Sequence, residues 1–155
     1  MNSDFKDLLK TFNEAGVRYL VVGGYAYAEH VEPRYTKDLD VWIQRTDENA
    51  DRVLAALRRF GAPLRELSRS DLTEPATFYQ IGLPPNRIDI ITQLEEMDFS
   101  ECWVRRKIGH LGDLAVNFIS AQDLIENKER TGRPRDLVDV EFLRQAQREN
   151  SNRDD

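Results

Sequence analysis

Residues 34–43 read RYTKDLDVWI, and this stretch decides both the fold class and the place of the candidate site. Its second half, DLDVWI, is a β-forming run with alternating side chains, which predicts a strand. Residues two apart in a strand project to the same face of the sheet. Asp38 and Asp40 are therefore expected side by side, whereas Leu39 and Val41 point the other way into the core.

The segments on either side of this strand alternate between helical and extended patterns. Upstream, residues 17–22 (VRYLVV) are a β-rich run closed by two glycines. Downstream, residues 47–60 carry an apolar stripe at helical spacing, with Asp47 as the expected N-cap. The full expected order is a helix (4–15), a strand (17–22), a helix (25–31), the strand 38–43, a helix (47–60), two strands (77–81 and 87–93) joined by a turn at 82–86, a helix (99–106), a strand (114–119) and two helices (120–130 and from 134).

This order predicts a single α/β (α+β) domain over residues 1–147. We expect a mixed, twisted β-sheet flanked by helices, with a short pair of helices at the C-terminal end. Residues 148–155 (RENSNRDD) are polar and are expected to form a disordered tail.

The composition favours a folded cytoplasmic domain. Of the 155 residues, 40% are hydrophobic and 32% are charged, which is a globular balance. No apolar run approaches the roughly 20 residues of a membrane helix, so no membrane partner is expected. The formal charge of −6 argues against a protein that coats duplex DNA through a general positive field. The single cysteine, Cys102, allows no intrachain disulfide and is interpreted as a structural thiol.

Asp38 and Asp40 are the first part of a carboxylate constellation. Adjacent carboxylates repel each other, and a divalent ion that prefers oxygen ligands, such as magnesium, compensates them directly. Asp89 lies among isoleucines in the run RIDII, and it would join the pair if its strand lay beside DLDVWI. Three converging carboxylates can hold two metals for in-line phosphoryl transfer. The alternatives are a surface feature for the Asp-x-Asp pair, an ion pair of Asp89 with Arg87, and a structural calcium site.

Two glycines and several cations could complete such a site. Gly23 and Gly24 end a strand and open a helix, where backbone N–H groups can approach phosphate oxygens at the positive helix end. A plain turn would also explain them. Arg34 and Lys37 flank the two acids and could steady phosphates, or they could be ordinary surface cations. The segment KERTGRPR (128–135) places four cations within eight residues, and it could also be a solvated junction between helices.

The order VVGGYAYAEH, RYTKDLDVWI and RIDIIT resembles the nucleotidyltransferase superfamily that shares the DNA polymerase β fold. Its signature is a glycine-containing turn, an Asp-x-Asp pair on the next strand and a third acid on a later strand. Within the superfamily, the chain is most similar to the bacterial AbiEii-like group of abortive-infection and toxin–antitoxin systems. The shared motifs are Arg-x-Thr-x-Asp-Leu-Asp at 34–40 and Asn-Lys…Gly-Arg-Pro-Arg-Asp at 127–136. The resemblance covers residues 17–143.

This resemblance implies a role for each part of the constellation. Gly23 and Gly24 would cradle a triphosphate, and Lys128 and Arg133 would reach that triphosphate or the acceptor. Asp38 and Asp40 would bind magnesium or manganese. Asp89 would be the third metal ligand or the general base for the incoming hydroxyl.

Two functions from different classes follow. The first is a metal-dependent nucleotidyltransferase that moves a nucleoside monophosphate from a nucleoside triphosphate, such as ATP, to a hydroxyl or phosphate of RNA, tRNA or protein. The resemblance adds a toxin–antitoxin or abortive-infection setting, with an antitoxin as a protein partner. The alternative is a nucleotide-binding or partner-binding module that keeps the fold without turnover.

Overall fold

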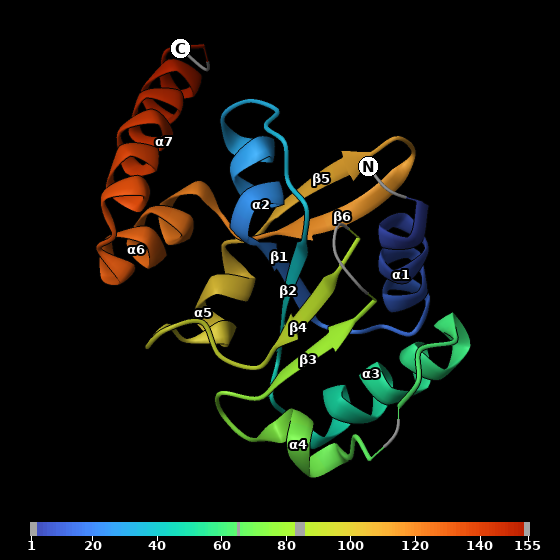
Figure 1. Cartoon of the computed structure of the whole chain (residues 1–155). Coiled ribbons are helices and arrows are strands. Elements are labelled where there is room, and N and C mark those ends of the chain that lie inside the picture. Colours follow the sequence, from blue (N-terminus) through green and yellow to red (C-terminus); the bar gives the residue numbers. More distant parts are fainter. Residues whose placement is uncertain (1–2, 65, 83–85, 154–155) are drawn as a thin grey trace.

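A six-stranded mixed sheet is the centre of the computed structural model, which describes residues 3–64, 66–82 and 86–153 (Figure 1). Across the sheet the strands follow the order β3 (Phe78–Ile81), β4 (Ile88–Ile91), β2 (Leu39–Ile43), β1 (Tyr19–Val22), β6 (Leu114–Phe118) and β5 (Lys107–Leu111). The pairs β3–β4, β1–β2 and β5–β6 are antiparallel, whereas β4–β2 and β1–β6 are parallel. The mixed α/β class expected from the sequence is confirmed.

Helices form two groups on either side of this sheet (Figure 1). In the first group, α1 (Ser3–Glu14) and α4 (Arg69–Thr73) both pack against α3 (Asp47–Phe60). In the second group, α2 (Gly23–His30) contacts both α6 (Ala121–Thr131) and α7 (Pro134–Arg153). The short helix α5 (Phe99–Val104) packs its first residue against Trp42 of β2, with 5.1 Å between ring centroids. Because Trp42 and Asp40 share a face of β2, α5 lies on the same side of the sheet as the acids.

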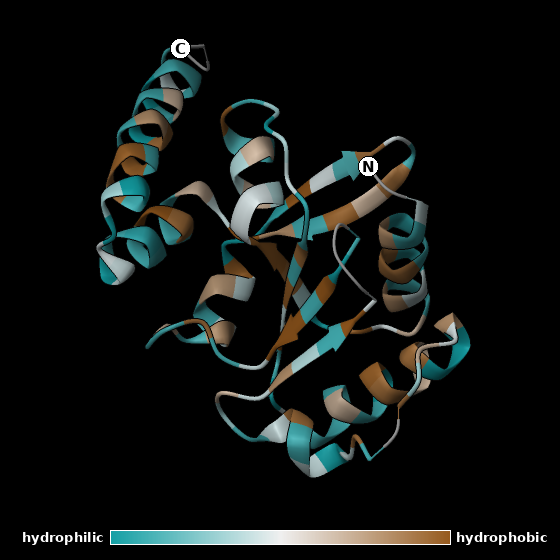
Figure 2. Cartoon of the chain, viewed as in Figure 1, coloured by the Kyte–Doolittle hydropathy of each residue, from teal (hydrophilic) through white to brown (hydrophobic). Residues whose placement is uncertain are grey.

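The central strands are apolar because both of their faces are covered. All four residues of β1 are buried, and Figure 2 shows the hydrophobic colour concentrated in the middle of the sheet. In β2, Leu39, Val41 and Ile43 are fully buried on one face, as the alternation in DLDVWI predicts. The opposite face of β2 begins with the acids. The strand therefore carries core residues and candidate site residues at once.

Most helix boundaries match the expected sequence signals, with one correction. The apolar stripe of α1 is buried as expected, and Ser120 caps α6 by accepting a hydrogen bond from the Asp123 backbone at 3.0 Å. The N-cap of α3 is Thr46 rather than Asp47, because the Thr46 hydroxyl accepts a hydrogen bond from the Asn49 backbone at 3.2 Å. Asp47 instead occupies the first turn, where its negative charge also suits the helix end.

Three elements differ from the sequence-based expectation. The edge strand β5 and the five-residue helix α4 were not predicted, since one contains Gly109 and the other is too short to show a period. The last helix continues to Arg153, where a disordered tail from residue 148 was expected. No proline or glycine interrupts this segment after Pro134, and Arg, Gln and Glu are good helix formers. Residues 83–85 of the expected turn at 82–86 lie outside the described residues.

None of the helices in the described part of the chain combines the length and the apolar character that a membrane crossing requires.

Candidate functional site

Glycine is required at the junction of β1 and α2 because other parts of the chain fill the space of a side chain. Gly23 has a positive φ of +66°, and a Cβ on it would overlap the Oδ2 atom of Asp40. A Cβ on Gly24 would lie 2.7 Å from Cγ2 of Thr36, closer than real contacts allow. The Asp40 carboxyl therefore lies directly against the first residue of α2, where the helix presents free N–H groups and its positive end.

The strand register brings three acids and one arginine together on one face of the sheet. In the parallel pair β2–β4, Asp40 lies opposite Asp89. One step earlier, the Leu39 backbone N–H donates to the Arg87 carbonyl at 3.0 Å, which places Arg87 beside Asp38. We call Asp38, Asp40, Arg87 and Asp89 the acid quartet. The adjacency that the sequence required, with the strand of Asp89 beside DLDVWI, is confirmed.

Arg87 binds two of the three acids, but it satisfies them unequally. One of its terminal nitrogens donates to Asp38 at 2.9 Å. Its Nε lies 3.1 Å from Oδ1 of Asp89, which is an ion-pair distance. Even so, Arg87 Nε and Asp89 Oδ1 are both buried without a hydrogen-bond partner, so this contact has the wrong angle for a hydrogen bond. Asp89 is 5% exposed, which makes its unpartnered oxygen a costly feature.

The acid quartet has three carboxyl groups and one arginine, and this imbalance affects the pKa of Asp40. Burial is the main cause that raises the pKa of Asp40 to about 7, followed by the negative charge of Asp89, a side-chain hydrogen bond with Asp89 and then the charge of Asp38. The Arg87 guanidinium lowers this pKa but does not offset the other effects. One arginine therefore neutralises three carboxyls incompletely, and the site attracts a further cation or a proton.

The acid quartet offers a divalent metal two of the ligands that it needs. In the described residues, no three His, Cys, Asp or Glu side chains are arranged to hold a metal ion, since Asp38 is directed to Arg87. Asp40 and Asp89 nevertheless face each other across the two strands, and one Asp89 oxygen has no hydrogen-bond partner. Magnesium is commonly bound by one or two carboxylates together with water and substrate phosphates. Asp40 and Asp89 fit that requirement.

A cavity of about 270 Å³ opens beside Asp40. Its lining brings together six residues that the sequence singled out: Gly23, Gly24, Arg34, Asp40, Lys128 and Arg133. Asp38 and Asp89 are part of the acid quartet but do not line this cavity, and neither does Lys37, which is exposed. The glycine turn and the late basic segment, about a hundred residues apart, therefore meet at one site.

Three cations of this cavity are held by two buried acids of α7. Asp139 accepts hydrogen bonds from Arg34 at 2.8 and 3.2 Å and from Lys128 at 3.0 Å. Asp136 accepts one from Arg133 at 2.7 Å and lies 3.6 Å from Lys128. We call these five residues the α7 ion cluster.

In the α7 ion cluster, the cations outweigh burial. Burial alone would raise the pKa of Asp139, but hydrogen bonds from Arg34 and Lys128 hold it below its usual value. The pKa of Asp136 is also lowered, because burial is outweighed by hydrogen bonds from Thr131 and Arg133. Arg133 of the basic segment pairs with an acid of the last helix, Asp136. The bridge from Arg34 to Asp139 was missed, since 105 residues separate them.

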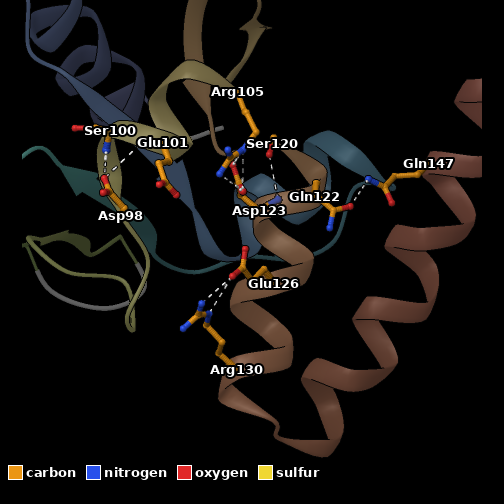
Figure 3. Close-up of polar contacts among 10 residues, drawn as sticks. All are labelled: Asp98, Ser100, Glu101, Arg105, Ser120, Gln122, Asp123, Glu126, Arg130 and Gln147. Carbon is orange, nitrogen blue, oxygen red and sulfur yellow. Dashed lines mark hydrogen bonds and ion pairs between the residues drawn. The ribbon is translucent and has the colours of Figure 1, made fainter.

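Polar contacts link the end of α5 to α6, through Arg105 and Asp123, and α6 to α7, through Gln122 and Gln147 (Figure 3). Arg105, just after α5, holds both carboxylate oxygens of Asp123 at 2.9–3.2 Å.

The single cysteine, Cys102, lies close to this pair. Burial, followed by the charge of Asp123, raises the pKa of Cys102 to about 12. The thiol is therefore protonated at neutral pH, which agrees with a structural role for Cys102.

A second depression, of about 560 Å³, lies at the opposite end of β2. Its lining includes Trp42, Thr46 and Asp98, but none of the predicted site residues. The Trp42 ring is buried against α5 at this far end. The larger volume is therefore separate from the acid quartet.

Comparison with solved structures gave matches over nearly the whole chain. The provisionally assigned nucleotidyltransferase TM1012 of Thermotoga maritima superposes with a TM-score of 0.59 at 16% identity, covering 94% of this chain and 91% of its own. ANT(2″)-Ia, in complex with adenylyl-2″-tobramycin, gives 0.59 at 13% identity, with 90% and 84% covered. The lincomycin-bound lincosamide adenylyltransferase LnuA gives 0.59 at 16% identity, with 93% and 96% covered. No protein-family model and no curated protein sequence matched the chain.

The chain has the nucleotidyltransferase fold. At these identities the likeness shows the fold, and the function must be argued from the site.

Proposed function

We propose that this protein is a metal-dependent nucleotidyltransferase that moves a nucleoside monophosphate from a nucleoside triphosphate to a hydroxyl acceptor. One observation carries the proposal: the Asp40 carboxyl lies against Gly23 at the start of α2 and opens on a cavity lined with cations. The acids proposed to bind a metal therefore lie next to the cations proposed to bind phosphates.

The residues divide the work by their positions. The start of α2 and the cations Arg34, Lys128 and Arg133 bind and orient the triphosphate. A divalent ion bound by Asp40 and Asp89 would neutralise charge that develops on the reacting phosphate. The acceptor oxygen forms a bond to the α-phosphorus, and the bond to pyrophosphate breaks. Asp89 is the second ligand of that ion or, where Asp40 alone holds the ion, the general base that takes the acceptor's proton.

Two kinds of similarity favour different classes of acceptor. The AbiEii-like motifs favour a hydroxyl or phosphate of RNA, tRNA or protein, in a toxin–antitoxin or abortive-infection setting with an antitoxin as partner. The neighbour bound to adenylyl-2″-tobramycin and the lincosamide adenylyltransferase favour a small-molecule hydroxyl. The alternative function is a nucleotide-binding or partner-binding module without turnover, in which Arg87 would permanently neutralise Asp38 and Asp89.

A thermal-shift titration tests the proposal. Each nucleoside triphosphate is added with and without magnesium to the wild type and to Asp38→Asn/Asp40→Asn. We expect one nucleotide to raise the midpoint by about 5–10 °C at a hundred times its dissociation constant, only with magnesium and only in the wild type. A screen for labelled transfer to RNA, protein and small molecules would follow. Stabilisation that is equal in the variant, or absent for every nucleotide, would contradict the proposal.

A further inference from the structure

Arg87 occupies the centre of the acid quartet and is its only cation among the described contacts. Its position is fixed by the sheet, since its carbonyl accepts the Leu39 N–H and the next residue, Ile88, pairs with Leu39. From there the guanidinium reaches Asp38 with one nitrogen and Asp89 with another. Asp89 is one of the two carboxylates proposed to hold the metal, and Asp38 lies beside them.

Arg87 binds Asp89 less completely than Arg105 binds another buried acid, Asp123. Arg105 makes three hydrogen bonds of 2.9–3.2 Å to Asp123. Arg87 approaches Asp89 to 3.1 Å without making a hydrogen bond, and both facing atoms are buried. Because the Arg87 side chain is 30% exposed, it can turn towards solvent without crossing the core. Its contact with Asp89 is easier to break than the Arg105 pair because it includes no hydrogen bond, even though Arg105 is the more exposed arginine.

We propose that Arg87 is a built-in competitor of the divalent metal: its guanidinium holds Asp38 and Asp89 together without the metal, and it must release Asp89 when the metal binds. Arg87 is then a positioning residue that sets metal affinity. This inference rests on the metal dependence of the proposed function. It adds that Asp89 becomes available beside Asp40 only after the guanidinium moves.

If Arg87 competes with the metal, its removal changes metal affinity in the opposite direction from the removal of a purely structural residue. Removing a structural ion-pair partner disorders the site and weakens metal binding. Removing a competitor leaves three carboxylates without a counter-ion, which strengthens metal binding and lowers the stability of the metal-free protein. The direction of the change in affinity therefore separates the two roles.

The experiment measures manganese binding without nucleotide, from the electron paramagnetic resonance signal of free Mn²⁺. The proteins are the wild type, Arg87→Gln, Arg87→Lys and Arg69→Gln. The last variant removes one positive charge from a surface pair with Asp51 and so controls for net charge. We expect Arg87→Gln to bind Mn²⁺ about tenfold more tightly than the wild type, Arg87→Lys to lie between the two, and Arg69→Gln to match the wild type.

Equal or weaker Mn²⁺ binding by Arg87→Gln would overturn the inference, as would the absence of binding by every protein tested. If Arg87→Gln does not fold, the Nε–H resonance of Arg87 in the wild type gives the answer. Saturation with Mg²⁺ should move this resonance towards the position of a solvated arginine, and an unchanged resonance would overturn the inference. Magnesium-dependent nucleotide binding by the wild type, measured separately, would leave the proposed function standing in that case.

Discussion

The acid quartet and the α7 ion cluster differ in how their buried carboxylates are neutralised. Both place carboxylates in a largely buried position at the edge of one cavity. In the α7 ion cluster, Asp136 and Asp139 face three cations, and hydrogen bonds hold the pKa of each acid below its usual value. In the acid quartet, three acids share one arginine, and the pKa of Asp40 rises to about 7.

This difference in charge balance indicates a structural role for the α7 ion cluster and a ligand-binding role for the acid quartet. Buried charges that are fully paired fix an arrangement, because removing either partner leaves an uncompensated charge. Buried charges that are left unbalanced cost stability, and they persist where a ligand completes them. We therefore expect the α7 ion cluster to hold helices and cations in place, and the acid quartet to bind the missing positive charge.

The largest effect is expected at Asp40. Asp40→Asn should reduce nucleotide transfer by about 1,000-fold or more, since it removes a proposed metal ligand while keeping the side-chain shape. The same change should leave the protein folded and at least as stable at pH 7.5, because a buried repelling charge is lost. Transfer rates and thermal midpoints measure the two effects. A variant that unfolds but keeps its transfer rate would contradict the assignment of Asp40.

The corresponding change in the α7 ion cluster should act with the opposite sign on stability. Asp139→Asn leaves Arg34 and Lys128 without their shared carboxylate, and Lys128 is only 12% exposed. We expect a loss of about 2–3 kcal/mol in the free energy of unfolding, measured by urea denaturation. Glu126→Gln, which removes the exposed partner of Arg130, is the matched control and should leave the midpoint nearly unchanged. A neutral Asp139→Asn would remove the distinction between the two clusters.

The pH dependence of stability should show the two clusters in separate windows. Asp40 has a raised pKa of about 7 in the folded protein, so the native state binds its proton more tightly than the unfolded state does. Its contribution is fully present below pH 4 and is lost as the pH rises through 7, by on the order of 2 kcal/mol. The pKa values of Asp136 and Asp139 are lowered, so their contribution is lost only as the pH falls below about 4.

A comparison of the wild type with Asp40→Asn isolates the loss of stability that occurs near pH 7. Denaturation at several values between pH 4 and pH 8 should give a steeper loss of stability with rising pH in the wild type than in the variant. Parallel curves would show that Asp40 is not protonated preferentially in the native state.

The acid quartet could be predicted from the sequence better than the α7 ion cluster. An acid in a β-run such as RIDII stands out, and period-two alternation places Asp38 and Asp40 on one face without any tertiary information. The strand register then makes the quartet, with Asp40 opposite Asp89. Sequence reasoning named Arg87 as a partner of Asp89, but only the register shows that it also binds Asp38.

The α7 ion cluster depends on long-range packing that no local pattern encodes. Asp139 resembles an ordinary acid on a polar helix, and its partner Arg34 resembles a surface cation beside Pro33. They meet only because α2 and α7 pack together, which brings the guanidinium of Arg34 over the ring of Tyr27 at 3.5 Å as well. The helical pattern of residues 134–153 is similarly weak, so the extent of α7 could not be read from periodicity.

The smallest effect should come from Arg133, and it tests whether the α7 ion cluster is scaffold alone. Arg133 is 69% exposed and hydrogen-bonds Asp136 while lining the cavity beside Asp40. Arg133→Gln should cost less than about 1 kcal/mol of stability, as for other exposed ion pairs. If the exposed face of Arg133 also binds phosphate, nucleotide affinity should fall by about five- to tenfold. Arg130→Gln, which changes an exposed cation outside the cavity, should leave that affinity unchanged. Equal affinities in the two variants would confine Arg133 to the scaffold and leave phosphate binding to Lys128, Arg34 and the start of α2.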